Sequence, residues 1–288
     1  MPDRTNMDAF STLMQHFNLE ASVYNNSRLS GDWNVHKLGN GRCGFHMITH
    51  GCCHLSVGDE INTTLEYGDL VIFTAEVEHQ LYACPQVPAS DTGLLCANVN
   101  FSHVGSKMIL NALPKVFVVR SESNHQWVEA IQSMLLSENT QTSFGTDVIL
   151  NRLSELVFIY ALRQELEAKS EQIGLLALYK HQGINQVLTE VHNTPEASWT
   201  VESMASFAAM SRTRFANLFK QLSGWTPMEY LTWWRMQLAW SKLQAGHKVY
   251  QVAQSSGYRS EAAFSRAFSR HFKVSAQDVK RQIKSELA

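Results

Sequence analysis

The chain has 288 residues, of which 44% are hydrophobic and 17% are charged. This length is sufficient for two domains with separate cores. No apolar run approaches the length of a membrane span, and no apolar segment follows the charged start, so we expect neither a membrane helix nor a signal peptide, and a cytoplasmic protein. Five cysteines, an odd number, argue against a disulfide framework and fit a reducing compartment.

The net charge of −2 hides an uneven distribution. From Gly183 onward, 13 Lys and Arg stand against 7 Asp and Glu, which gives +6, whereas the preceding residues hold the remaining 11 and 19, which gives −8. A basic end joined to an acidic body is typical of a polyanion-binding module attached to another domain.

A short helix is expected at Met7 to Phe17, and residues 18–120 then read as many short strands. Turn residues such as Gly31-Asp32 and Gly58-Asp59 separate runs rich in Val, Ile, Leu, Phe and His. This spacing predicts a sandwich or a small barrel.

Two stretches of this region resemble cupin barrels. The run from Gly68 to Phe73, followed by His79, is similar to the second cupin motif. Phe45-His46, with Gly51 and Cys53, resembles the cupin-like sensor domain of a subset of AraC-type transcription regulators. The resemblance implies a β-barrel that senses a small signal.

Histidines and cysteines gather at residues 46–54. If this stretch is one strand, His46, His50, Cys52 and His54 share a face, and His79 approaches them in a barrel. Alternatively, Gly51 bends the strand, and these side chains then do not share a face. The His-x-His and Glu of a cupin metalloenzyme are missing, so we expect no cofactor and favour a structural or ligand-contacting role, with a metal sensor or a metalloenzyme as the alternative.

All five cysteines lie in the expected sensor domain. They are either small hydrophobic residues of buried strands or thiols that react with an oxidant. A disulfide between the adjacent Cys52 and Cys53 is strained, so a switch would join one of them to a distant cysteine. The candidate sensing residues are His46, Cys52, Cys53, His79, Cys84 and Cys96.

Helical periodicity returns after residue 120. One stripe runs through Trp127 and Leu135, and a wider one runs from Val148 to Ala161. The family resemblance implies that such helices form a dimer contact, here through Asp147 to Glu167, and packing within one chain is the alternative. We expect a sensor and dimerisation domain at residues 1–170, a linker at 171–186 and a DNA-binding domain at 187–288.

Two copies of a helix-turn-helix pattern occupy the C-terminal part. The stretch from Lys248 to Lys273 holds a helix, a turn at Gly257, and a helix with Phe264, Phe268 and Phe272 on one stripe. The stretch from Val201 to Leu222 repeats it, with Phe215 aligned to Phe264 and Ser211 aligned to Ser260. The helix expected at Pro227 to Gln244 is about 25 Å long and separates the two units by roughly one turn of DNA.

The C-terminal pattern resembles the DNA-binding domain of the AraC/XylS family. The matching pieces are Leu218-Phe219-Lys220, Gly224, Thr226-Pro227, Tyr230, Arg235, Ala239, Leu243, Val252-Ala253, Gly257-Tyr258 and Phe264 to Phe268. Lys273 and Ala276 stand where the family usually has Gly and Pro. The phase of the Phe stripes directs other side chains outward. The expected DNA contacts are Arg212, Thr213, Ala216, Asn217, Lys220, Arg259, Ala262, Ser265, Arg266, Ser269 and Arg270.

The sequence thus predicts an α+β protein of two domains, a cupin-like β-barrel with a helical dimerisation segment and an all-α domain with two helix-turn-helix units. Its expected function is that of a transcription regulator, more an activator than a repressor, and not an enzyme. The expected partners are double-stranded promoter DNA, RNA polymerase, a small-molecule or oxidant signal and a second copy of the chain. The alternative is a cupin-type metalloenzyme or metal sensor fused to a DNA-binding domain.

Overall fold

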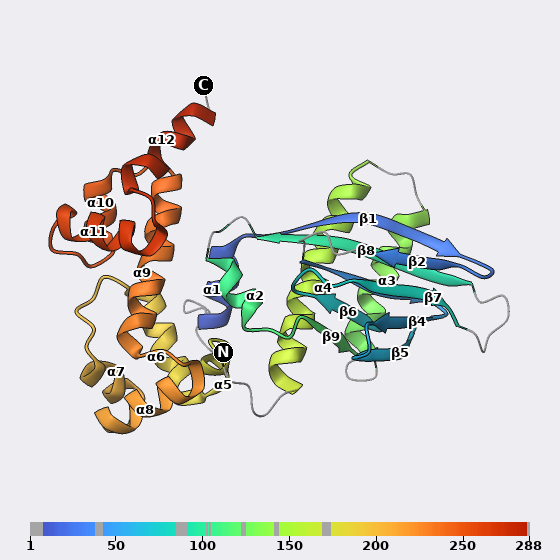
Figure 1. Cartoon of the computed structure of the whole chain (residues 1–288), viewed down its shortest axis with the longest axis horizontal. Helices are drawn as coiled ribbons and strands as arrows, with labels where there is room; N and C mark the ends of the chain where they lie inside the picture. Colours follow the sequence, from blue (N-terminus) through green and yellow to red (C-terminus); the bar gives the residue numbers. More distant parts are fainter. Residues whose placement is uncertain are drawn as a thin grey trace. The chain divides into compact units, whose positions relative to one another are not determined.

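A computed structural model describes residues 8–37, 43–84, 91–101, 103, 105–121, 125–140, 144–168 and 174–286. These residues form two compact units (Figure 1). The sheet unit comprises the described residues within 18–101 and 106–168, and the helical unit comprises residues 8–17, 103, 105 and 174–286. No helix of the described residues is long and apolar enough to cross a membrane.

The sheet unit is built from two antiparallel sheets. A five-stranded sheet has the order β1-β8-β3-β6-β9, and a four-stranded sheet has the order β2-β7-β4-β5. The strands are β1 (Leu19–Leu29), β2 (Asn34–Lys37), β3 (Cys43–His50), β4 (Cys52–Val57), β5 (Ile61–Glu66), β6 (Leu70–Phe73), β7 (His79–Ala83), β8 (Thr92–Phe101) and β9 (Val116–Val119). The expected cupin-like architecture is confirmed, but the described strands form two sheets and not a closed barrel.

Gly51 explains how the chain passes from one sheet to the other. Its φ of +65° lies in the left-handed region, and a Cβ at this position would come within 2.5 Å of the carbonyl oxygen of Asp91. The chain therefore turns between β3 and β4, which belong to different sheets. The idea that His46, His50, Cys52 and His54 share one strand face is wrong, because the turn falls in the middle of that run.

The core of the sheet unit lies between the two sheets. In β4, burial alternates along the strand, and Cys53, Leu55 and Val57 point inward. They pack with buried side chains of the other strands, among them Ile48 and Leu81. Burying an aliphatic side chain of this size stabilises a fold by about 1.5–3 kcal/mol.

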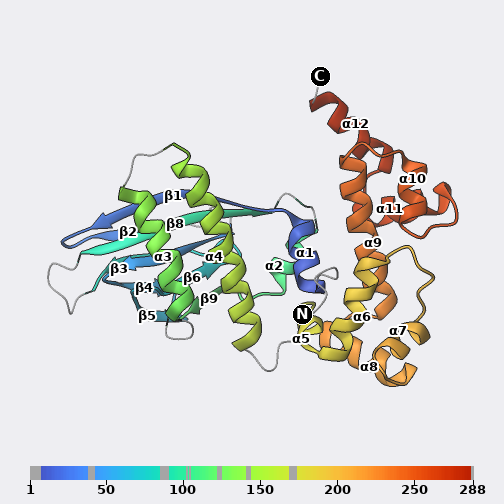
Figure 2. The same cartoon turned by 180° about the vertical axis from the view of Figure 1, so that it is seen from behind.

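Three helices complete the sheet unit: α2 (Ser106–Asn111), α3 (His125–Thr140) and α4 (Thr146–Ala168). Figure 2 shows α3 and α4 running across the strands. Helix α4 covers the edge strand β1, since Asn151 Oδ1 accepts a hydrogen bond of 2.9 Å from the amide of Val23. Glu155 Oε1 accepts a second one, of 3.4 Å, from Ala21. These contacts occupy amide groups that an edge strand would otherwise expose.

The helical unit surrounds one long helix, α9 (Pro227–Gln244). Leu231, Trp234, Met236, Ala239 and Leu243 of α9 are fully buried. The other helices are α1 (Ala9–Phe17), α5 (Ala177–Lys180), α6 (Gln182–Asn193), α7 (Val201–Phe207), α8 (Arg212–Ser223), α10 (Val249–Ser255), α11 (Glu261–Phe272) and α12 (Ala276–Glu286). Figure 1 shows α7 and α8 at one end of α9 and α10 and α11 at the other.

Helix α1, from the start of the chain, packs in the helical unit. The ring of Phe17 lies 6.2 Å from that of Trp233, and the ring of His16 lies 5.2 Å from that of Trp234. His103 adds a third contact, because its Nε2 donates a 3.1 Å hydrogen bond to the carbonyl of Gln237. Residues distant in sequence therefore cover one side of α9.

Candidate nucleic-acid interface

Helices α7 and α8 form the first helix-turn-helix unit. Thr200 caps α7, since its Oγ1 accepts a 3.1 Å hydrogen bond from Ser203 N, and Ser211 caps α8 through Arg214 N. The turn closes with a 2.9 Å bond from Met210 N to the carbonyl of Ala205. The rings of Phe215 and Phe219 fix α8 against the core.

Helices α10 and α11 repeat this arrangement. Ser260 caps α11 through Ala263 N, and Tyr258 N donates a 3.0 Å bond to the carbonyl of Ala253. The residue at the centre of the turn is left-handed in both units, Ala209 with φ +52° and Gly257 with φ +74°. The predicted turn at Gly257 is therefore present, and the two units close their turns in the same way.

A side chain of α9 lies between the segment before α7 and the turn of the second helix-turn-helix unit. Arg235 Nε donates a 2.6 Å hydrogen bond to the carbonyl of Pro195, and its Nη2 donates a 2.8 Å bond to that of Ala197. The same Nη2 lies where a Cβ on Gly257 would approach to 2.8 Å. The guanidinium thus joins the segment before α7 to the turn of the second unit.

The expected DNA contacts lie outside the core. Ala216, Ser265 and Ser269 are half-buried, and the others are exposed: Arg212, Thr213, Asn217, Lys220, Arg259, Ala262, Arg266 and Arg270. Sequence reasoning passed over Arg214, which is exposed in the first turn of α8. The sequence pattern that could have identified Arg214 is its place in the first turn of the helix that begins after Ser211.

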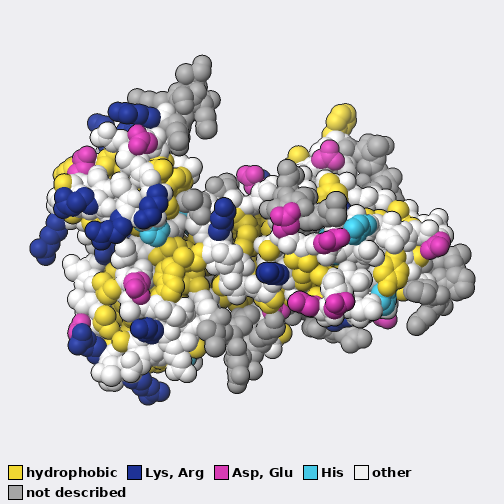
Figure 3. Space-filling view, viewed as in Figure 1, with side chains coloured by type: hydrophobic (Ala, Val, Ile, Leu, Met, Phe, Trp, Pro, Cys, Tyr) yellow, Lys and Arg dark blue, Asp and Glu magenta, His cyan; other side chains and the backbone are white. Residues whose placement is uncertain are grey.

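The basic side chains differ in their partners. Arg212 Nε forms a 2.6 Å ion pair with Glu202 Oε1 of α7, and both side chains remain largely exposed. Within the part of the chain that the structure describes, no ion pair involves Arg259, Arg266 or Arg270. On the face drawn in Figure 3, Lys and Arg gather over the helical unit. Such a surface suits a polyanion.

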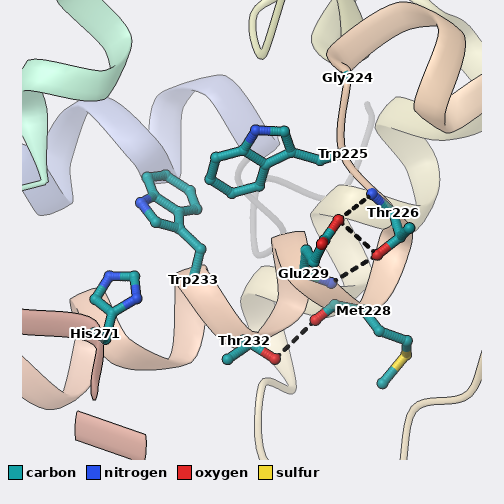
Figure 4. Close-up of a pocket in the computed structure, with 8 residues that line it drawn as sticks. All are labelled: Gly224, Trp225, Thr226, Met228, Glu229, Thr232, Trp233 and His271. Carbon is teal, nitrogen blue, oxygen red and sulfur yellow. Dashed lines mark hydrogen bonds between the residues drawn. The ribbon is translucent and has the colours of Figure 1, made fainter. Parts of the chain in front are cut away.

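A hollow of about 650 Å³ lies beside the start of α9 (Figure 4). The rings of Trp225 and Trp233 meet edge to face there, with centroids 6.0 Å apart. The carboxylate of Glu229 also lines the hollow, and its Oε2 already accepts hydrogen bonds from the amide and the hydroxyl of Thr226. The lining residues are Gly224, Trp225, Thr226, Met228, Glu229, Thr232, Trp233 and His271, none of which was a predicted site residue.

The sheet unit brings together two of the predicted sensing residues. His46 Nε2 and His79 Nε2 are 2.9 Å apart, and His79 Nδ1 donates a 2.9 Å bond to the carbonyl of Val77. Neutral His79 therefore accepts from His46 Nε2–H, which leaves His46 Nδ1 as a buried acceptor. Burial, the largest cause, lowers the pKa of both imidazoles.

The other histidines of that run lie apart. His50 is exposed at the end of β3, and His54 bonds to Asn62 and Thr64 of β5. The described residues contain no group of three or more side chains placed to hold a metal ion.

The cysteines are free thiols of the sheet unit. Burial raises the pKa of Cys43 to about 12, that of Cys84 to about 12 and that of Cys96 to about 11. Burial also raises the pKa of Cys53. Four of the five thiols are therefore held in the protonated, less nucleophilic form, and Cys52 alone is half-exposed.

Two matched helix-turn-helix units with outward basic side chains, joined to a cupin-like unit, define a DNA-binding transcription regulator. The chain matches the cupin family over residues 8–167 and a helix-turn-helix domain over residues 204–282.

The chain is also similar to several transcription regulators along most of its length. It is 28% identical to the HTH-type transcriptional regulator AlkR of Acinetobacter baylyi, over 96% of this chain and 100% of that protein. It is 28% identical to the RCS-specific HTH-type transcriptional activator RclR of Escherichia coli, over 96% and 99%. It is 30% identical to a putative AraC-like transcription regulator of Streptomyces antibioticus, over 82% and 86%. The chain belongs to the AraC-like transcription regulators with an N-terminal cupin domain.

Proposed function

We propose that the chain is a sequence-specific activator that binds promoter DNA with both helix-turn-helix units. The observation that carries this is the pair of equally capped helices, α8 and α11, each turning a polar face outward from a buried Phe stripe. A capped helix of this kind fits the major groove. Sequence would be read by Arg212, Thr213, Ala216, Asn217, Ala262, Ser265, Arg266 and Ser269, with phosphate contacts from Lys220, Arg259 and Arg270.

The chain acts as a homodimer in this proposal. Helices α3 and α4 expose apolar side chains, notably Met134, Val148 and Leu156, although Leu150 and Val157 of the same stripe are buried in the sheet unit. Exposed apolar side chains on adjacent helices favour a protein partner. A second copy of the same face supplies a self-complementary surface, and two copies would present four helix-turn-helix units to the promoter.

The sheet unit senses the signal in this proposal. The buried His46 and His79 pair and the cysteines are the candidate groups, and a small organic molecule or an oxidant is the proposed stimulus. The protein works in the cytoplasm, has no catalytic role, and passes the signal to RNA polymerase. The similarity to the activator RclR and the regulator AlkR supports this assignment.

Binding of the full-length chain to a random pool of DNA duplexes tests the proposal. We expect enrichment of one sequence, with the logarithm of affinity falling with the logarithm of salt concentration by about 0.9 for each phosphate contacted. The control is Arg28→Ala, which removes an exposed arginine of the sheet unit and should leave binding unchanged. An affinity that does not respond to salt, or a pool without enrichment, contradicts the proposal.

A further inference from the structure

Two cysteines lie at the same end of the neighbouring strands β4 and β7: Cys52 begins β4, and Cys84 directly follows β7. The antiparallel register pairs Leu55 with Leu81, His54 with Tyr82 and Cys53 with Ala83, and one further step of this register would bring Cys52 opposite Cys84. Directly opposed residues of an antiparallel pair have Cα atoms about 4.5–5.5 Å apart. A disulfide requires about 4.4–6.8 Å, so the spacing of a continued register suits a bond between these residues.

Side chains on this face of the two strands meet. The rings of His54 and Tyr82, two residues along from the cysteines, have centroids 5.0 Å apart. Cys52 lies close enough to Cys84 to contribute to raising the pKa of that thiol, after burial, which is the largest cause. Cys53 points the other way, into the core between the sheets, so it does not compete for either thiol.

The two thiols differ in access. Cys52 is half-buried, whereas Cys84 is buried. The other three cysteines, Cys43, Cys53 and Cys96, are also buried. An oxidant from solvent therefore reaches Cys52 first, and Cys84 is the neighbour that can resolve the product.

We propose that Cys52 and Cys84 form a reversible disulfide when the chain meets a peroxide. Deprotonated Cys52 attacks one peroxide oxygen, the O–O bond breaks, and the other oxygen leaves as an alcohol or water after taking up a proton, which gives a sulfenic acid. The Cys84 thiol then attacks the Cys52 sulfur, the S–O bond breaks, and the departing hydroxide takes up the Cys84 proton and leaves as water. Two thiols lose two electrons and the peroxide gains them.

The bond would cross-link β4 to β7 in the four-stranded sheet. Its formation does not depend on DNA binding, and only its use as the signal rests on the proposed function. DNA binding by the reduced chain is measured in parallel, so that failure of the disulfide and failure of the regulator assignment give different results.

The test treats the full-length chain with hydrogen peroxide, blocks the remaining thiols, digests without reductant and analyses the peptides by mass spectrometry. We expect one peptide pair joined through Cys52 and Cys84, loss of two of the five free thiols, and their return with dithiothreitol. A treated chain in which Cys52 is lost to a sulfinic acid, joined to Cys53 or joined to another chain overturns the proposal.

Two variants sharpen the result. In Cys84→Ser, a sulfenic acid on Cys52 should persist and react with dimedone, because the resolving thiol is gone. Cys43→Ser is the matched control, since it removes a buried thiol from the other sheet and should leave the cross-linked pair intact. Equal yields of dimedone adduct in Cys84→Ser and in the unaltered chain also contradict the assignment.

Discussion

The guanidinium of Arg235 lies against Gly257, at the turn between α10 and α11. A Cβ on Gly257 would approach Nη2 to 2.8 Å and the carbonyl oxygen of Glu196 to 3.1 Å. Arg235 cannot easily yield, because it is also bonded to the carbonyls of Pro195 and Ala197. The guanidinium therefore packs against the turn of the second helix-turn-helix unit in a space that only glycine leaves open.

Gly257→Ala should destabilise the helical unit more than Gly246→Ala does. Both glycines have a positive φ, of 74° and 84°, so both variants carry the same backbone strain, but nothing lies within 4 Å of a Cβ at Gly246. The difference isolates the clash with Arg235, which we expect to cost about 1–3 kcal/mol. Denaturant unfolding followed by tryptophan fluorescence measures it, and equal losses would contradict the contact.

Lys273→Gly should stabilise the chain. Lys273 ends α11 with φ +61°, in the same left-handed conformation that Gly224 adopts at the end of α8 with φ +77°. A side chain in this conformation costs about 1 kcal/mol, which glycine recovers. The mirror variant Gly224→Ala, at a site open to a Cβ, should lose a similar amount. A drop in the unfolding midpoint of Lys273→Gly would refute this.

Arg266→Ala should weaken binding to the selected duplex by about 1–3 kcal/mol and relax the preference at one base pair. Arg266 is exposed on α11, and no ion pair engages it among the residues described. Lys220→Ala should instead weaken binding to all sequences alike and reduce the salt slope by about 1. Fluorescence anisotropy with single-base variants of the duplex distinguishes the two roles. An unchanged base preference would make Arg266 a phosphate contact.

Leu156→Glu should weaken the proposed dimer and shift the chain toward monomer. Leu156 is 52% exposed on α4, and a carboxylate in the centre of an apolar contact should raise the dimer Kd at least about tenfold. Val274→Glu, at an apolar side chain of the helical unit that is 39% exposed, serves as the control. Sedimentation equilibrium of both variants gives the Kd, and a shift common to both would show that α4 is not the contact.

Acid should destabilise the helical unit below about pH 6.5. Burial lowers the pKa of His192 to about 3, and Nε2 of His192 shares a 2.7 Å hydrogen bond with the Tyr230 hydroxyl. The unfolded chain takes up the proton first, so each pH unit lost between about 6.5 and the folded pKa costs about 1.4 kcal/mol for this group. Above about pH 6.5, protonation of His192 no longer changes the free energy of unfolding.

Thermal unfolding between pH 7 and 5 tests this dependence. His192→Gln should flatten the slope, whereas His36→Gln, at an imidazole that is 44% exposed, should leave it unchanged. The same slope in both variants would assign the effect to other groups, such as His103, whose pKa burial lowers to about 4.

Local patterns in the sequence predicted the DNA-binding half well. The Phe stripes and the caps Ser211 and Ser260 depend only on residues within one helical turn, and the structure has both caps and the burial of Phe215 and Phe264. Phe272, expected on the same stripe, is only half-buried.

The remaining features depend on contacts between distant residues. Periodicity places Val148 and Leu156 on the same stripe as Leu153, yet both are exposed, because the strands cover a narrower face of α4 than the stripe occupies. The His46 and His79 pair and the proximity of Cys52 to Cys84 depend on how distant strands pair, which no local pattern specifies. The two separate sheets follow from the turn at Gly51.

Helix α1 has a consequence for the exchange of parts between relatives. Its rings cover Trp233 and Trp234 of α9, although 216 positions separate Phe17 from Trp233 along the chain. A chimera joined once, in the linker region, would pair this α9 with another protein's first helix and leave two indoles poorly covered. A hybrid regulator that is to remain soluble must therefore take residues 8–17 and the C-terminal residues from the same protein, even though the segment between them comes from another.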